Sequence, residues 1–172
     1  TVFNLAPAAP GDDSFGGMLS ITAGTLNADF ADVSTSSSLN MGAGGTLNLA
    51  VGTLSSTNTY LGSLTGTGNL NVSFADTGDI LELGGTGGFT GAITLGSNGS
   101  GSNGNTGTLQ LFNGTFGSIG EDPGAPGNSV VIGGDPSIAT SGTVTLGNNT
   151  YTGSTTVSSG FKLLVSGVSG AL

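Results

Sequence analysis

Short runs in which apolar and polar residues alternate recur along most of the chain, and this alternation constrains the fold more than any other feature. Thr46–Val51 and Leu70–Phe74 are two examples. Successive side chains of a β-strand point to opposite sides of a sheet, so a period of two is typical of a strand buried on one side. The runs are bounded by Gly, Asn, Asp or Ser, which tolerate the backbone angles of tight turns. The chain is therefore predicted to form many short strands.

Helix is expected to be almost absent, because no segment has a helical period and strong helix formers such as Lys, Glu, Arg and Gln are rare. Strands are predicted at Met18–Thr22, Thr25–Ala28, Phe30–Val33, Ser38–Met41, Thr46–Val51, Leu70–Phe74, Ile80–Leu83, Ala92–Leu95, Thr108–Phe112, Ser129–Ile132, Thr143–Leu146, Thr155–Val157 and Lys162–Ser166.

The charge balance excludes several classes of partner. The chain has one Lys or Arg against ten Asp or Glu residues, and its net charge is −9. A nucleic acid requires cationic side chains to replace its phosphate counterions, and an anionic lipid surface attracts the same kind of side chain. No run of about 20 apolar residues is present in the sequence, as a membrane-spanning helix would need. We therefore expect neither nucleic-acid binding nor membrane insertion.

The residue types of most catalytic sites are also missing. The sequence contains no His, Cys, Trp or Arg, which excludes triads based on His or Cys. The acidic residues are scattered and offer no pair suited to glycoside hydrolysis. A lyase would have to use Lys162 as its base, and we interpret this residue as a surface lysine. The chain is predicted not to be an enzyme.

Internal repetition distinguishes between the architectures that short strands and glycine-rich turns allow. Leu83–Leu95 aligns with Leu146–Val157, and the pattern Gly-Thr-Leu-x-Leu occurs at Gly45–Leu49 and Gly107–Leu111, with a looser relative at Gly68–Val72. Such repeats favour stacked coils that bury their apolar side chains on one another. The prediction is an all-β, parallel β-solenoid. The alternative is a pilin-like β-sandwich completed by a donated strand.

One segment resembles a known family. Asn148–Val165 is similar to the autotransporter-associated β-strand repeat, with a degenerate copy at Gly85–Leu95, and Leu61–Leu70 resembles segments that accompany that repeat. The resemblance implies a right-handed parallel β-helix in large bacterial surface or secreted proteins, often adhesins. It implies no catalytic residue.

Calcium is the only cofactor that the sequence suggests, because hard cations bind carboxylate and carbonyl oxygens. The best candidate ligands are Asp76, Asp79 and Glu82, since the first two flank a tight turn. Weaker candidates are the pairs Asp12–Asp13 and Glu121–Asp122. The alternative interpretation is that these acids are turn residues that keep a nearly uncharged protein in solution.

The two ends of the sequence suggest self-assembly. Thr1–Leu5 is strand-like, and Pro7 and Pro10 follow it, so we divide the chain into a strand and linker at residues 1–13 and a solenoid at residues 14–172. Gly160–Leu172 is apolar and strand-like. A head-to-tail contact between copies of the chain would form a filament. The predicted interface residues are Val2, Phe3, Leu5, Leu163, Val165, Val168 and Leu172.

These observations favour an extracellular or cell-surface structural protein that assembles with copies of itself into a fibre. A trypsin-like protease has one cleavage site in the chain, at Lys162, which suits a location outside the cell. The first alternative is an adhesin whose insertions, Ser97–Gly107 or Gly120–Asn128, contact a host or matrix carbohydrate. The second is an ice-binding solenoid that uses Thr143–Thr145 and Thr155–Thr156. In any stacked solenoid, Asn or Thr side chains are expected to form ladders along the axis.

Overall fold

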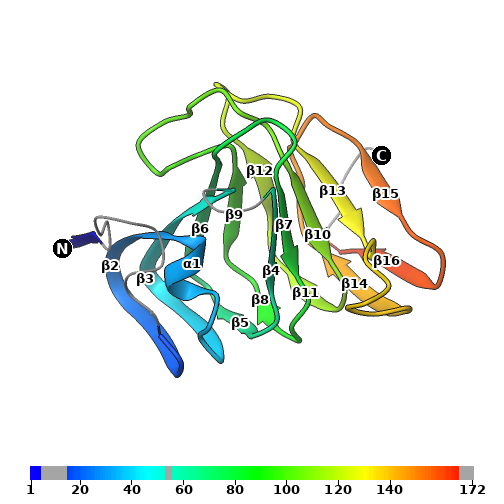
Figure 1. Cartoon of the computed structure of the whole chain (residues 1–172), viewed down its shortest axis with the longest axis horizontal. Coiled ribbons are helices and arrows are strands. Elements are labelled where there is room, and N and C mark those ends of the chain that lie inside the picture. Colours follow the sequence, from blue (N-terminus) through cyan, green and yellow to red (C-terminus); the bar gives the residue numbers. More distant parts are fainter. Residues whose placement is uncertain (5–14, 53–55, 167–172) are drawn as a thin grey trace.

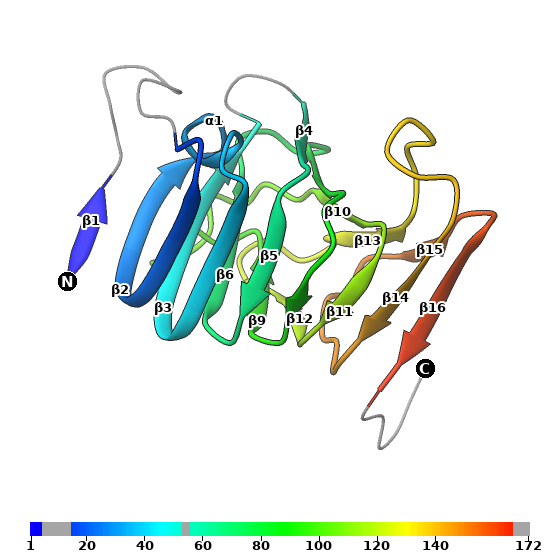
Figure 2. The same cartoon turned by 90° about the horizontal axis from the view of Figure 1, so that it is seen from below.

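The chain forms a parallel β-solenoid of about 7 turns with 3% helix. This computed structural model describes residues 1–4, 15–52 and 56–166. All strand pairs among these residues are parallel, and the colours in Figures 1 and 2 run in sequence order along the stack. The sandwich alternative is therefore wrong, because the strands of a pilin-like sandwich pair largely antiparallel.

Each full coil passes through three walls in a fixed order. Walls 1 and 2 belong to one 11-stranded sheet, because the long strands β2 (Met18–Asp29) and β3 (Ser38–Val51) run through both. Wall 1 continues with β5 (Ser63–Gly66), β8 (Gly88–Phe89), β11 (Gly114–Phe116), β14 (Gly142–Leu146) and β16 (Phe161–Val165). Wall 2 contains β1 (Val2–Asn4), β6 (Asn69–Phe74), β9 (Ala92–Leu95) and β12 (Ile119–Glu121). Wall 3 is the five-stranded sheet of β4 (Thr57–Tyr60), β7 (Ile80–Leu83), β10 (Thr108–Leu111), β13 (Ser129–Ile132) and β15 (Thr155–Val157).

The core lies inside the coils and is built from columns of apolar side chains. In wall 2 one such column contains Leu26, Leu47, Leu70, Ile93 and Ile119, which lie in register on successive strands and are all buried. Alternation along each strand directs these side chains inward and their polar neighbours outward. Stacking thus removes the apolar face of each coil from water.

One predicted strand is a helix. Phe30–Val33 forms α1, which stands between β2 and β3, where later coils have a strand of wall 3. Phe30 and Val33 are three residues apart, so both lie on one side of the helix, and both are buried in the core. Asp32 Oδ2 accepts a hydrogen bond of 3.1 Å from the backbone N–H of Asp29, which stabilises the first turn.

In two places the structure joins two successive predicted strands into one long strand. Met18–Thr22 and Thr25–Ala28 both lie within β2, with a register shift against β3 between Ile21 and Ala23, and β3 likewise joins two predicted strands. At this shift any side chain on Gly45 would place a Cβ atom 2.0 Å from the carbonyl oxygen of Ile21. Strands β4, β5, β8, β11 and β12 are not predicted, because they are two to four residues long and lack a clear apolar alternation.

The repeats found in the sequence are only partly neighbours in the stack. Gly45–Leu49 and Gly68–Val72 lie side by side on β3 and β6, as the repeat prediction requires. Gly107–Leu111 lies on wall 3 instead. The aligned segments that begin at Leu83 and Leu146 start on different walls, so their similarity does not reflect equivalent positions in a coil.

The boundary predicted between residues 13 and 14 falls outside the described residues. Val2–Asn4 forms β1, which pairs in parallel with β2 and so extends wall 2 by one strand. Within the described ranges, no helix has the length and hydropathy needed to cross a membrane.

Candidate binding groove

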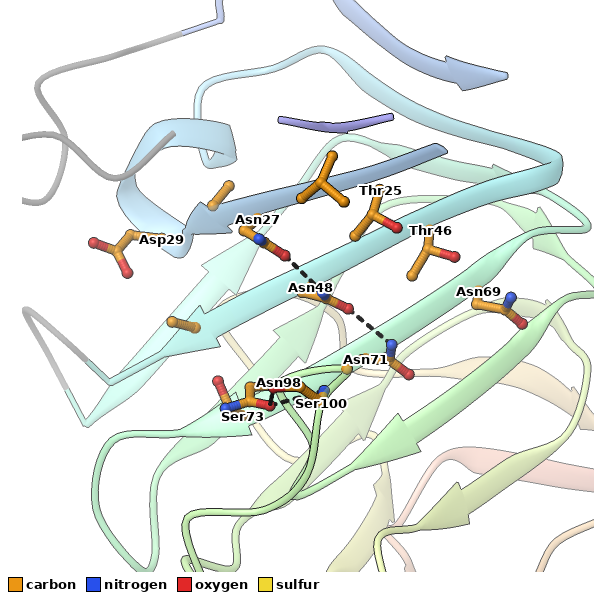
Figure 3. A pocket seen from close by; sticks show the side chains of 14 residues that line it. Thr25, Asn27, Asp29, Thr46, Asn48, Asn69, Asn71, Ser73, Asn98 and Ser100 are labelled. Carbon is orange, nitrogen blue, oxygen red and sulfur yellow. Dashed lines mark hydrogen bonds between the residues drawn. The ribbon is translucent and has the colours of Figure 1, made fainter. Parts of the chain in front are cut away.

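The outer face of wall 2 carries an open groove with a volume of about 750 Å³. Strands β2, β3 and β6 form its floor, and the segment Asn98–Ser100, which follows β9, lines it as well (Figure 3). Polar side chains dominate the lining. Those labelled in Figure 3 are Thr25, Asn27, Asp29, Thr46, Asn48, Asn69, Asn71, Ser73, Asn98 and Ser100.

Strand register arranges the floor as a grid. Outward-facing positions on β2, β3 and β6 form three rows that cross the strands: Thr25, Thr46 and Asn69; Asn27, Asn48 and Asn71; and Asp29, Ala50 and Ser73. Neighbouring strands of a sheet lie about 4.8 Å apart, and alternate residues of one strand about 6.7 Å apart. The grid thus presents amide and hydroxyl groups at two regular spacings.

The middle row is a hydrogen-bonded ladder. Asn27 donates from Nδ2 to Oδ1 of Asn4 at 2.5 Å, Asn48 donates to Asn27 at 2.6 Å, and Asn71 donates to Asn48 at 2.8 Å. The ladder that the sequence predicts is therefore confirmed for Asn. Each amide has two N–H groups and two acceptor lone pairs, so each inner member keeps one of each outside the ladder. Oδ1 of Asn71 accepts no hydrogen bond among the described residues, and the ladder ends there, since the next residue in the row is Thr94 and the Thr94 hydroxyl does not donate to it.

The loop after β9 holds its own shape through side chains that bond its backbone. The buried residue Ser97 donates its backbone N–H to the carbonyl of Val72 at 3.0 Å, and its Oγ accepts from the N–H of Gly99 at 3.2 Å. Asn98 Oδ1 accepts from the N–H of Ser100 at 3.0 Å. Such local bonds are typical of Asx and ST turns.

Two further asparagines fasten the same loop to the end of β6. Asn103 donates from Nδ2 to the carbonyl of Phe74 at 2.7 Å, and Asn105 donates to the carbonyl of Ala75 at 2.5 Å. These bonds satisfy backbone acceptors that follow the strand. The loop is thus fixed at both of its ends to the wall that it partly covers.

Gly99 brings the loop against the floor of the groove. Its φ is +83°, and a Cβ atom there would lie 2.3 Å from Oδ1 of Asn48. Only glycine combines this backbone angle with this contact without strain. The Asn ladder and the loop are therefore in direct contact at the centre of the grid.

The electrostatics of the groove are weakly anionic. Among the described residues that line it, Asp29 supplies the one carboxylate and none carries a cationic side chain. Burial raises the pKa of Asp29 above its usual value, and the nearby negative charge of Asp32 raises it further. The remaining polar groups of the lining are neutral amides and hydroxyls.

The structure does not bring the three predicted calcium ligands together in one cluster. Asp79 is buried, and its Oδ2 accepts from the N–H of Asp76 at 2.8 Å, while the buried Glu82 accepts from Thr59 Oγ1 at 2.5 Å. Across the part of the chain that the structure describes, no group of three or more acidic side chains could hold a metal ion. Asp79 and Glu82 instead accept separate hydrogen bonds in the fold.

Of the two weaker calcium candidates, the structure describes only the pair Glu121–Asp122. Residues 12 and 13 lie outside the described residues. Glu121 Oε2 accepts from the backbone N–H groups of Gly127 and Asn128, both at 3.0 Å, and its Oε1 accepts from Thr152 N–H at 2.9 Å. Glu121 thus joins the insertion Gly120–Asn128 to the next coil.

The predicted interface residues lie at the two ends of the stack where they are described. Val2 and Phe3 are exposed on β1, although that strand pairs with β2 of the same chain. Leu163 and Val165 lie on β16, in register with buried positions of β14. The other three predicted residues, Leu5, Val168 and Leu172, are outside the described residues.

The groove itself was not predicted as a site, although Ser97–Gly107 was proposed to contact a ligand and does supply part of its lining. A signal for the floor exists in the sequence. The motif Gly-Thr-Leu-Asn at residues 24–27 recurs at 45–48, and Gly-Asn-Leu-Asn follows at 68–71. Its copies are 21 and 23 residues apart, and this unequal spacing conceals the row.

Comparisons with known proteins do not assign this chain to a family. No protein-family model matches the chain, and searches of curated proteins and of solved structures found no match.

Proposed function

We propose that this chain is an extracellular, non-catalytic structural protein that assembles head to tail by adding parallel coils at the ends of its solenoid. The observation that carries the proposal is an uncovered core at the last described coil. Val157 and Val165 continue inward columns whose preceding members, Ile132 and Leu146, are buried, yet they are 45% and 40% exposed. Exposed apolar strand edges favour the addition of another strand.

The order of the walls supports a second copy as the occupant. Along the chain the walls follow in the order 1, 2, 3, and the last described strand, β16, lies on wall 1. The first described strand, β1, lies on wall 2. A copy placed beyond β16 would therefore continue the same order with its β1. Its exposed Phe3, which is in register with Leu26, would extend the inward column of wall 2.

The location outside the cell rests on sequence features. The resemblance of Asn148–Val165 to the autotransporter-associated repeat favours a bacterial surface or secreted protein. The low charge and the single site for a trypsin-like protease, at Lys162, favour the same environment. Adhesion through the groove is the alternative function that the geometry supports.

Ice binding is less favoured by the geometry. A surface that orders water needs a flat and regular array, but Gly99 lies against the centre of the Asn and Thr grid. The two threonine runs suggested by the sequence do not join into one array, because β14 lies on wall 1 and β15 on wall 3.

The proposed assembly is tested with the purified chain by sedimentation velocity over a concentration series and by negative-stain electron microscopy. We expect rods that lengthen with concentration. Val157→Lys should abolish them, because a charge would enter the inward column at the contact. Thr156→Lys is the matched control, since Thr156 is exposed on the outward side of the same strand. Monomers at every concentration, or equal assembly of the two variants, would contradict the proposal.

A further inference from the structure

We propose that the groove on wall 2 is a binding site for a neutral oligosaccharide, recognised by the Asn ladder and the polar rows beside it. This inference does not rest on the proposed assembly, because its polar rows lie on the outer face of β2, β3 and β6, whereas the assembly uses apolar side chains at the ends of the stack. Val2 of the terminal strand β1 also lines the groove, at its edge.

The size of the groove fits a ligand of a few sugar units. Its volume of about 750 Å³ falls within the range of roughly 300–1,000 Å³ that small-molecule sites occupy. Its floor is a strand wall held by backbone hydrogen bonds on three successive coils, and its loop is fastened at both ends. The site is therefore formed before any ligand binds, which reduces the entropy lost on binding.

The ladder supplies the chemistry that sugar hydroxyls need. A hydroxyl both donates and accepts hydrogen bonds, and a side-chain amide does the same. Asn27 uses one N–H and one lone pair in the ladder, so the second of each is available in the groove, whereas Gly99 lies against the amide of Asn48. Oδ1 of Asn71 adds an acceptor that ends the row. A chain of amides bonded to one another has fixed orientations, so its free groups are already positioned.

The neighbouring row provides unpartnered polar groups. The side chains of Thr25, Thr46 and Asn69 form no hydrogen bond among the described residues, and all three line the groove. Because they occupy one register position on three strands, they repeat at about the strand spacing of 4.8 Å. A ligand with regularly repeating hydroxyl groups can contact several of them at once.

Charge and polarity disfavour anionic polymers and apolar ligands. The lining contains no cation, and the whole chain has a net charge of −9, so an anionic polymer would be repelled. Among the described lining residues, the apolar side chains are Val2, Ala28 and Ala50, which offer little contact to an apolar ligand. No aromatic ring lines the groove, so binding rests on hydrogen bonds rather than on stacking, and we expect modest affinity.

The test is a titration of the full chain with uncharged hexasaccharides of glucose and of N-acetylglucosamine, followed by ¹H–¹⁵N NMR. The side-chain NH₂ signals of Asn27, Asn48 and Asn71 are direct probes of the ladder. For at least one of these sugars, we expect saturable shifts of these signals, with smaller changes at walls 1 and 3. A sulfated hexasaccharide of the same length should cause none.

Two substitutions separate the groove from the rest of the surface. Thr46→Val and Asn69→Ala each remove a polar group that forms no described hydrogen bond within the chain, so the fold should be kept. Combined, they should weaken binding at least fivefold. Thr143→Val is the matched control, because Thr143 is an exposed outward residue of β14 on wall 1. Shifts with the sulfated sugar alone, no saturable shift with any neutral sugar at millimolar concentration, or equal affinity of groove and control variants would overturn the proposal.

Discussion

Asn71 donates a hydrogen bond of 2.8 Å from its side-chain Nδ2 to Oδ1 of Asn48, its counterpart 23 residues earlier in the chain. Asn48 in turn donates a hydrogen bond of the same kind, from its Nδ2 to Oδ1 of Asn27. A polar interaction on the outer face thus runs parallel to the apolar columns inside the coils. It links three coils whose backbones are already paired, and it provides the floor of the groove.

The ladder should contribute measurably to stability. Asn48→Ala removes two hydrogen bonds of the ladder at a partly buried position. It leaves Oδ1 of Asn27 and Nδ2 of Asn71 without their partner in the ladder. We expect a loss of about 1–2 kcal/mol in the free energy of unfolding, measured by urea denaturation. Asn113→Ala is the control, because this exposed turn residue forms no described side-chain hydrogen bond. Equal stability of the two variants would show that the ladder adds nothing beyond the backbone pairing.

Asn128 should be more sensitive, because it is fully buried. Its Oδ1 accepts from the N–H of Gly107 at 2.9 Å, and its Nδ2 donates to the carbonyl of Ala125 at 2.6 Å. Asn128→Ala would leave both backbone groups buried without partners, so we expect a loss of about 2–3 kcal/mol in thermal or urea unfolding. Asn148→Ala, at an exposed position, should change stability little. An Asn128 variant as stable as this control would contradict the assigned role.

Glu121 should make stability depend on pH. Burial raises the pKa of its carboxyl, but hydrogen bonds from Thr152, Asn128 and Gly127 outweigh burial and lower the pKa below the usual value of 4.5. A lowered pKa in the folded state gives stability that is present above the unfolded pKa. That stability is lost as the pH falls through the folded pKa.

The corresponding experiment compares Glu121→Gln with the unsubstituted chain in urea between pH 7 and pH 3. We expect the variant to be less stable at pH 7 and the difference to shrink below about pH 4.5, as the native carboxyl becomes protonated. Asp76→Asn is the control, since Asp76 is exposed and its carboxylate accepts no described hydrogen bond. A difference that is constant with pH would show that the charge of Glu121 is not involved.

The contact between the loop and the floor can be separated from backbone strain. Gly99 and Gly104 both have φ of +83°, but a Cβ atom at Gly104 would meet nothing within 4 Å. Gly104→Ala should therefore show only the strain of the left-handed conformation, about 1–2 kcal/mol. Gly99→Ala should lose more and should also shift the side-chain NH₂ signal of Asn48 in NMR spectra. Identical effects of both substitutions would show that the loop does not press on the ladder.

Local sequence patterns predict most of the strands but not every element. Thr46–Val51 alternates clearly, and it is a strand with its apolar side chains inside. Phe30–Val33 has the same kind of composition, yet it forms α1, because the spacing of Phe30 and Val33 also fits a helical turn and Asp32 can stabilise the start of that turn. Four residues are too few for either period to exclude the other.

The site was harder to predict than the fold. The insertion Ser97–Gly107 was recognised as a segment that could contact a ligand, but the surface beneath it was not. Thr25, Thr46 and Asn69 are ordinary outward residues of strands, and nothing in their immediate neighbours separates them from outward residues on other walls. The predicted acids were more conspicuous in the sequence, yet Asp79 and Glu82 accept separate hydrogen bonds within the fold, and the described residues contain no cluster of three or more acids.

Period-two alternation and glycine-rich turns are local properties of each segment, so the amino-acid sequence is enough to predict short strands in stacked coils. The sequence also shows that charged side chains are few and that almost all of them are acidic. Only the tertiary structure decided which residues share a row, because coil lengths differ and a row depends on the register between strands. The same register placed Asn48 between Asn27 and Asn71, and the path of the loop after β9 brought Gly99 onto it.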